Sequence, residues 1–241
     1  MLFKLIKHEF KASYRSYLIF YLIVIALAFL GPVMYNIQLE AVASLLVPFV
    51  FIAIFGVFIF TLVNVFKSFG ERIFGKPGYL LFSVPAKTRD IFLSRVLVNI
   101  VWMVSSIIVS VIAVYIFIVV LGGEAVAEGI FDTLKNLFNA VEPKEIILGL
   151  LSSGISFISF MALILLVQSI ANTLYHGAKK GLIATILYFV IAWGVSFITE
   201  QIYANLTVTQ QSYAEMGVGV LLSVIYFGIS YYLVDKKLEL E

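Results

Sequence analysis

The side chains that could take part in chemistry are concentrated in one basic segment, residues 67–95. It reads KSFGERIFGKPGYLLFSVPAKTRDIFLSR and holds six of the sixteen Lys and Arg residues of a 241-residue, mostly apolar chain. Its centre, residues 79–84, is a short apolar patch between two chain breakers, residues 75–78 and Pro85. The patch is too short to cross a membrane and too apolar to stay in water, so we expect it to dock on the membrane or in a groove of a partner protein. The chemistry indicated is binding rather than catalysis.

Residues that catalysis or metal binding would need are absent or isolated. The chain has no Cys, which excludes disulfides, thiol chemistry and thiolate metal sites. Its two histidines, His8 and His176, are far apart in polar segments, and a lone surface histidine is usually solvated. No GxxxxGK[ST], GxSxG or HExxH pattern occurs, so no P-loop nucleotide site or hydrolase centre is indicated. We expect no catalytic residue, no metal and no cofactor in this chain, and any ATP must be bound elsewhere.

The elements that position the basic segment are membrane-spanning helices. Hydrophobic residues make up 62% of the chain and charged residues 12%, with a mean hydropathy of +1.09, so the bilayer must act as its solvent. The apolar runs are apolar on every face, as in helices rather than membrane strands. They lie near residues 17–35, 41–66, 92–121, 146–174, 182–199 and 216–234. The sequence therefore predicts an all-α membrane protein with six transmembrane helices.

The basic residues predict the orientation of these helices. Fourteen of the sixteen Lys and Arg residues fall on one side of the predicted spans, and only Lys135 and Lys144 fall on the other, together with eight of the fourteen acids. Positive charge stays on the cytoplasmic side during insertion, so both termini are expected in the cytoplasm. The net charge of +2 hides this asymmetry and gives no support to nucleic acid as a partner. Arg95 is counted here as part of the basic segment, and the rest of the predicted spans contain no charged residue. Proton-coupled carriers are built around charged residues in their spans, so this argues against coupling to a proton gradient.

Two amphipathic segments flank the spans. Residues 1–16 have one apolar and one basic face, which predicts a helix in the membrane interface, either a topology anchor or an elbow into the first span. Residues 122–144 open with a Gly pair, have helical apolar spacing and stop at Pro143. This outer amphipathic segment either caps a pathway or rests on the outer leaflet. No linker divides the chain, so we expect residues 1–241 to form a single transmembrane domain.

The polar residues within the spans are uncharged. Such residues are usually interhelical hydrogen-bond partners worth about 1 kcal/mol or less each, and packing is the first interpretation. The alternative is contact with a transported substrate. The candidates for a substrate pathway are Asn64, Asn99, Ser106, Gln168 and Asn172.

The basic segment also carries a family resemblance. The stretch ERIFGKPGYLLFSVPAKTRDIFLSRVLVNIVW resembles the E...G..GYLLFSLPVSR..I..SK segment of bacterial ABC-2-type transporter permeases. A basic amphipathic N-terminus, six spans and a length near 240 residues fit the same plan. Residues 86–88 are Ala-Lys-Thr where the family commonly has Val-Ser-Arg, and Lys76-Pro77 before Gly78 is a second departure.

The resemblance implies a permease in the cell membrane that pairs with a second permease subunit, the same or paralogous, and with two ATPase subunits that bind ATP and Mg. In such permeases the cytoplasmic loop, here residues 67–90, forms a coupling helix. Carried over by position, the candidate ATPase contacts are Glu71, Arg72, Phe74, Gly75, Lys76, Pro77, Gly78, Tyr79, Leu80 and Leu81.

The implied activity is export of an amphipathic substrate. A peptide such as an antimicrobial or toxin peptide, a lipid or a drug would fit. ATP binding would draw the two ATPase subunits together, pull the coupling loops inward and move the helices at the seam between permeases. Two alternatives remain from the residues themselves: an ATP-independent carrier or facilitator, and a membrane scaffold protein.

Overall fold

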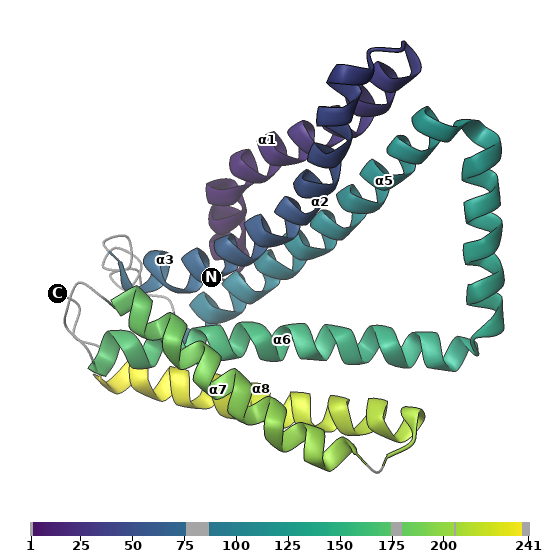
Figure 1. Cartoon of the computed structure of the whole chain (residues 1–241). Helices are drawn as coiled ribbons and strands as arrows, with labels where there is room; N and C mark the ends of the chain where they lie inside the picture. Colours follow the sequence, from purple (N-terminus) through teal and green to yellow (C-terminus); the bar gives the residue numbers. More distant parts are fainter. Residues whose placement is uncertain (1, 76–86, 175–179, 205, 238–241) are drawn as a thin grey trace. The chain divides into compact units, whose positions relative to one another are not determined.

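The chain folds almost entirely into helices (Figure 1). The computed structural model describes residues 2–75, 87–174, 180–204 and 206–237. There is no β-strand among these residues. The helices, labelled as in Figure 1, are α1 (Leu2–Asn36), α2 (Glu40–Phe69), α3 (Glu71–Phe74), α5 (Thr88–Ala140), α6 (Pro143–Leu174), α7 (Lys180–Tyr203) and α8 (Val208–Lys237). The prediction of an all-α chain is confirmed.

Six of the described helices, all except α3, are long and apolar enough to cross a membrane. Each predicted apolar run lies within one of them. The fold thus has the features of a multi-pass membrane protein, while the side on which each terminus lies stays a prediction. The helices extend beyond the apolar runs, because polar and charged residues at their ends continue the same backbone hydrogen bonding.

The predicted interfacial segment, residues 1–16, is not a separate helix among the described residues. It forms the first turns of α1, which continues without a break into the first apolar run. The ring of Phe10 stacks on that of Trp102, with centroids 4.6 Å apart, and Trp102 Nε1 donates a hydrogen bond to Ser13 Oγ at 2.8 Å. These contacts hold the segment against α5, and both interpretations, topology anchor and elbow, stay predictions.

Helix α5 turns a corner at Gly123 (Figure 1). Its 53 residues would extend about 80 Å if straight, far more than one bilayer crossing needs. Gly123 has φ 78° and ψ 173°, a backbone conformation that residues with a Cβ rarely adopt. It divides α5 into two helical parts. The second part, ending at Ala140, covers most of the predicted outer segment. Pro143 does not lie in a loop but begins α6, the helix position that proline favours.

The described residues form two compact units, each treated separately below. Unit 1 comprises Met1–Val65 and Leu97–Ala140, and unit 2 comprises Phe66–Val96 and Val141–Glu241. The division passes through α2 and α5, so two continuous helices connect the units. The prediction of a single permease domain stays a prediction.

The core of unit 1 joins α1, α2 and the first part of α5. The ring of Tyr17 stacks on Trp102, with centroids 4.3 Å apart, and Val24, Val57 and Ala113 are buried beside them. Aromatic stacking of this kind adds to the packing that holds helices together in lipid, where burial of apolar surface alone gives little preference for helix contact. Unit 1 is therefore held by side-chain shape as well as by the polar contacts described below.

In unit 2, α6 packs closely against α8 and also against α7 (Figure 1). Ser159 Oγ on α6 donates a hydrogen bond to the carbonyl of Gly219 on α8 at 2.7 Å and lies 2.7 Å from Ser223 Oγ. A Cβ at position 219 would lie 2.7 Å from Cγ2 of Ile155. Small residues at such a seam let two helix backbones approach closely.

Replacing Gly219 by Ala is expected to lower the free energy of unfolding by about 1–3 kcal/mol, the usual cost of overpacking. The added methyl would have to displace Ile155 or push α8 away from the serine contacts. Unfolding of the detergent-solubilised protein would measure this. Gly217→Ala is the control, since a Cβ there has no atom within 4 Å. Equal stability of the two variants would mean that the α6–α8 seam is looser than described.

Candidate functional site

The candidate site begins where α2 passes into the short helix α3. The Gly70 amide donates to the Phe66 carbonyl at 2.8 Å, and the Phe74 amide donates to the Gly70 carbonyl at 2.9 Å. Hydrogen bonding therefore continues through the turn at Gly70. Phe69 and Ile73, on either side of it, are fully buried. Because apolar side chains anchor both sides of the turn, α3 is a firm extension of α2 rather than a loose loop.

Arg95 on α5 fixes this junction. Its guanidinium donates from Nη1 to the Ser68 carbonyl and from Nη2 to the Arg72 carbonyl, the latter at 3.3 Å. The side chain is only 2% exposed. A buried guanidinium is costly unless it is hydrogen bonded, and its planar fork suits two acceptors at once. Arg95 thus connects the end of α2, α3 and the start of α5.

The burial of Arg95 corrects its assignment to the surface loop. The sequence does contain a signal that could have indicated it. Arg95 follows Ile91 by four residues and precedes Trp102 by seven, and both of these are buried on the same helix. Helical spacing places such residues on one face. The statement that the spans hold no charged residue therefore needs one exception, at the start of the third.

The structure describes only the first part of the predicted ATPase-coupling set. Glu71, Arg72 and Phe74 lie in α3, and Gly75 follows its end. Arg72, Phe74 and Gly75 are half-buried. The remaining residues of the set lie outside the described part of the chain: Lys76, Pro77, Gly78, Tyr79, Leu80 and Leu81. Their role as contacts stays a prediction.

Two of the predicted substrate-pathway residues line a pocket of about 480 Å³ in unit 2. Gln168 and Asn172 come from the end of α6, and Asn172 Nδ2 donates to the Gln168 carbonyl at 2.8 Å. Gln168 also lies against Gly70, where a Cβ would be 3.0 Å from Nε2. The pocket is lined by Phe66, Lys67, Gly70, Phe74, Gly75, Gln168, Asn172, Lys180, Gly181 and Thr185. We call it the Lys67–Lys180 pocket.

The other three pathway candidates, Asn64, Asn99 and Ser106, lie in unit 1. Ser106 Oγ is buried between Tyr21 Oη and Thr61 Oγ1, each at 2.8 Å, which joins α5 to α1 and α2. Ser106 therefore serves helix packing in this structure, the interpretation that polar residues in spans usually take.

Asn64 and Asn99 differ in their hydrogen bonding. Asn64 Nδ2 donates to the Phe60 carbonyl of its own helix at 2.9 Å. Asn99 is buried, and its Nδ2 has no hydrogen-bond partner in the part of the chain that the structure describes. Neither observation identifies a ligand. Among the five pathway candidates, Gln168 and Asn172 are the two that line the pocket described above.

The described helices have the length and apolar character of a multi-pass membrane protein, and Arg95 of α5 holds the turn between α2 and α3. Within the described ranges, no group of three or more His, Asp or Glu residues could hold a metal ion. Comparison with protein-family models, curated proteins and solved structures gives no match to this chain.

Proposed function

We propose that this chain is the membrane-spanning subunit of an exporter driven by a separate ATPase, which docks on α3 and the loop after it. The observation that carries the proposal is the Arg95 contact with the carbonyls of Ser68 and Arg72. A docking point can drive transport only if force applied to it reaches the spans. Arg95 connects α3 to the first turns of α5, while the hydrogen bonding through Gly70 connects it to α2.

The transmission path follows the helices themselves. Both α2 and α5 continue from unit 2 into unit 1, so a displacement of α3 acts on both units through unbroken backbone. A helix transmits such a displacement because its packed side chains resist deformation. Inward movement of α3 on ATP binding would then change the arrangement of spans against a second permease subunit, the same or paralogous.

The finer parts of this proposal depend on the resemblance to ABC-2-type permeases. The proposed direction of transport is export, and the proposed substrate is an amphipathic peptide, lipid or drug. The proposed location is the cell membrane, with both termini in the cytoplasm. The positions of Lys67 and Lys180 are consistent with that orientation. Each lies at the end of an apolar helix that faces the same pocket, where basic residues mark a cytoplasmic edge.

The proposal is tested by co-purifying the chain with its candidate ATPase and measuring ATP hydrolysis in the complex. Leu80→Asp is expected to weaken co-purification at least about tenfold, since a charge in an apolar docking patch removes a central contact. Glu71→Ala is expected to lower hydrolysis in the complex. Leu137→Asp is the matched control, because Leu137 is an exposed leucine on the second part of α5.

Two outcomes would contradict the proposal. The first is an intact complex with unchanged hydrolysis in both variants. The second is the absence of any ATPase from the purified wild-type complex together with substrate movement that needs no ATP, which would favour the carrier or facilitator. A partner that binds at the loop without hydrolysing nucleotide would indicate the scaffold instead.

A further inference from the structure

The corner of α5 at Gly123 forms a pocket that the proposed function does not use. The residues on both sides of this corner belong to unit 1. One part of the pocket, of about 330 Å³, is lined by residues between Ser110 and Ile118 before the corner and between Ala127 and Leu134 after it. Apart from one serine and the hydroxyl of one tyrosine, the side chains that line this part are apolar.

A second part of the pocket is acidic. It has a volume of about 320 Å³ and adjoins the apolar part, because Tyr115, Ala127 and Phe131 line both. Its charged lining residues are Glu124 and Glu128, and among the described residues no Lys or Arg lines either part. Neither carboxylate has a hydrogen bond or an ion pair within the described part of the chain. We call the two parts together the α5 corner pocket.

The two parts of the α5 corner pocket lie at different positions along the predicted span. Residues 110–118 fall inside the apolar run of residues 92–121, whereas both glutamates lie beyond its end, in the outer segment. In a bilayer, the apolar part would therefore lie at the level of the hydrocarbon and the carboxylates at its polar edge. This arrangement matches a ligand with an apolar chain and a cationic end.

Charge decides which kind of amphipathic molecule suits the pocket. The carboxylates repel the phosphate of a phospholipid, and a neutral alkyl chain gains only from the apolar part. An organic ammonium gains from both parts. The rings of Tyr115 and Phe131 meet edge to face with centroids 5.5 Å apart, and aromatic faces attract cations. The outer segment, residues 122–144, has four acids and two lysines, so its field also favours cations.

We propose that the α5 corner pocket binds a small amphipathic organic cation, such as an alkylammonium. The ammonium group would lie at Glu124 and Glu128, and the alkyl chain would extend past Tyr115 and Phe131 into the apolar part. The volumes of about 330 Å³ and 320 Å³ are at the lower end of the range of small-molecule sites, roughly 300–1,000 Å³.

The cation site does not require an ATPase. The assay below contains none, so failure of this proposal is distinct from failure of the exporter proposal. Glu128→Lys tests the acidic part, because it reverses one charge and the new lysine can pair with Glu124 four residues before it. Glu124 itself is left unchanged, since it directly follows Gly123 and an acid stabilises the start of a helix. Val114→Trp tests the apolar part by filling it from an exposed position.

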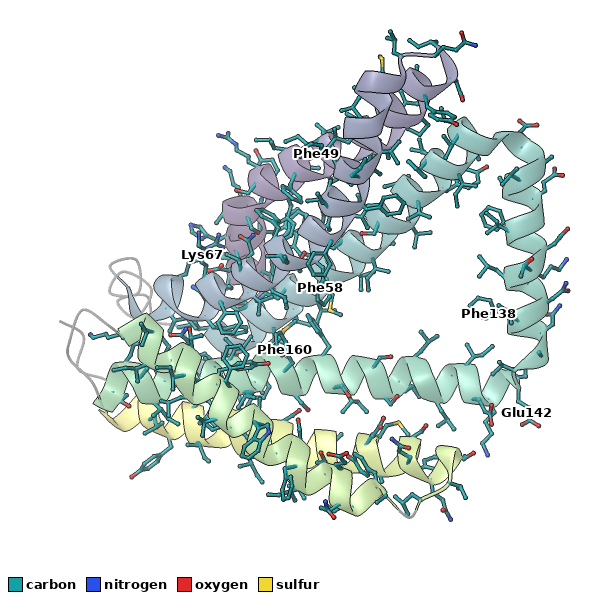
Figure 2. The ribbon with its side chains drawn as sticks, in the orientation of Figure 1. Phe49, Phe58, Lys67, Phe138, Glu142 and Phe160 are labelled. Carbon is teal, nitrogen blue, oxygen red and sulfur yellow. The ribbon has the colours of Figure 1, made fainter. Side chains whose placement is uncertain are left out.

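The chain offers a matched control for each change. Glu142→Lys makes the same charge change just past the end of α5, at a labelled residue that lines neither part of the pocket (Figure 2). Val104→Trp adds the same side chain to the same helix, at an exposed position that also lines neither part. General attraction of cations to an acidic surface would respond to both glutamates alike.

The experiment places the full-length protein in phosphatidylcholine nanodiscs. Binding of radiolabelled dodecylammonium is measured by equilibrium dialysis, with empty nanodiscs as the background. We expect wild type and both controls to bind it above this background, and more weakly at high salt. Glu128→Lys and Val114→Trp should each bind it about tenfold more weakly.

Three further probes separate the contributions of the chain and the charge. Dodecanol has the chain without the charge, tetramethylammonium has the charge without the chain, and dodecanoate has the opposite charge. Dodecanol and tetramethylammonium should each bind to wild type at least about tenfold more weakly than dodecylammonium. Dodecanoate should not bind above the background, because the carboxylates of the pocket repel it.

Each of four outcomes would overturn the proposal. Equal binding by Val114→Trp and Val104→Trp would mean that the cation binds elsewhere, and this comparison decides the matter even if Glu128→Lys fails to fold. Equal losses in Glu128→Lys and Glu142→Lys would indicate general surface charge. Dodecanol bound as tightly as dodecylammonium would identify a site for neutral alkyl chains, such as those of lipids. Tetramethylammonium bound as tightly would show that the apolar part is not used.

Discussion

Arg95→Met should destabilise the protein by about 3 kcal/mol or more, because hydrogen bonds to a charged group contribute about 1.5–3 kcal/mol each and two are lost. Methionine fills a similar volume but leaves the carbonyls of Ser68 and Arg72 without this donor inside the protein. Unfolding of the solubilised protein in a denaturant titration measures the stability. In the proposed complex with an ATPase, we expect the same variant to retain subunit binding but to lose the coupling of hydrolysis to substrate.

Two further variants separate the role of Arg95 from that of charge. Arg95→Lys keeps the charge but cannot match the two-pronged guanidinium, so an intermediate loss is expected. Arg89→Met removes a cation whose side chain is 67% exposed at the start of the same helix, and it should change stability by less than about 0.5 kcal/mol. Similar behaviour of the Arg89 and Arg95 variants would refute the claim that Arg95 fixes the α2–α3 junction.

Trp102→Ala is expected to be the other severely destabilising change, at about 3 kcal/mol. Aromatic-to-Ala changes in protein cores cost about 3–5 kcal/mol, and the lower end applies because lipid can solvate part of the exposed surface. The rings of Phe10 and Tyr17 both stack on the indole, and its Nε1 donates a hydrogen bond to Ser13 Oγ. Its removal therefore loosens the whole N-terminal half of α1 from α5.

The chain provides an unusually clean control for this prediction, because it has only two tryptophans. Trp193 on α7 is 75% exposed, and Trp193→Ala should cost less than about 1 kcal/mol. Thermal unfolding measures both variants. Proteolysis at the N-terminal turns of α1 gives a second readout, which should rise only in Trp102→Ala. Equal effects at the two positions would mean that the aromatic stack does not anchor α1.

Taken together, the two changes test different kinds of helix contact. Arg95 acts through hydrogen bonds to backbone carbonyls in unit 2, whereas Trp102 acts through ring stacking in unit 1. We expect only Arg95→Met to affect coupling beyond its effect on stability. Of the two residues, only Arg95 contacts the α2–α3 junction, where the proposed ATPase would dock. A coupling defect in Trp102→Ala at full stability would mean that the aromatic stack in unit 1 also takes part in the transmission.

Part of the candidate site could be predicted from local sequence. The basic segment, its breakers and its short apolar patch are contiguous in the chain, and the amides of Gln168 and Asn172 are distinctive in an apolar run. The local sequence does not predict which residues from other helices lie beside these amides in the folded chain. Lys67 is about a hundred residues from Gln168 and Lys180, and cations at two helix ends share a pocket only once the helices are packed.

The sequence by itself determined that this chain is helical and suited to a bilayer, because hydropathy and helix length are properties of each run alone. It also indicated the basic segment as the place where a partner would bind. Tertiary structure decided which polar groups are used for packing and which line a cavity. Ser106 and Arg95 are buried and hydrogen bonded to other helices. Lys67 and Lys180 line one pocket. The physical reason is that desolvation and hydrogen-bond geometry depend on which helices meet, and helix pairing is a long-range property of the chain.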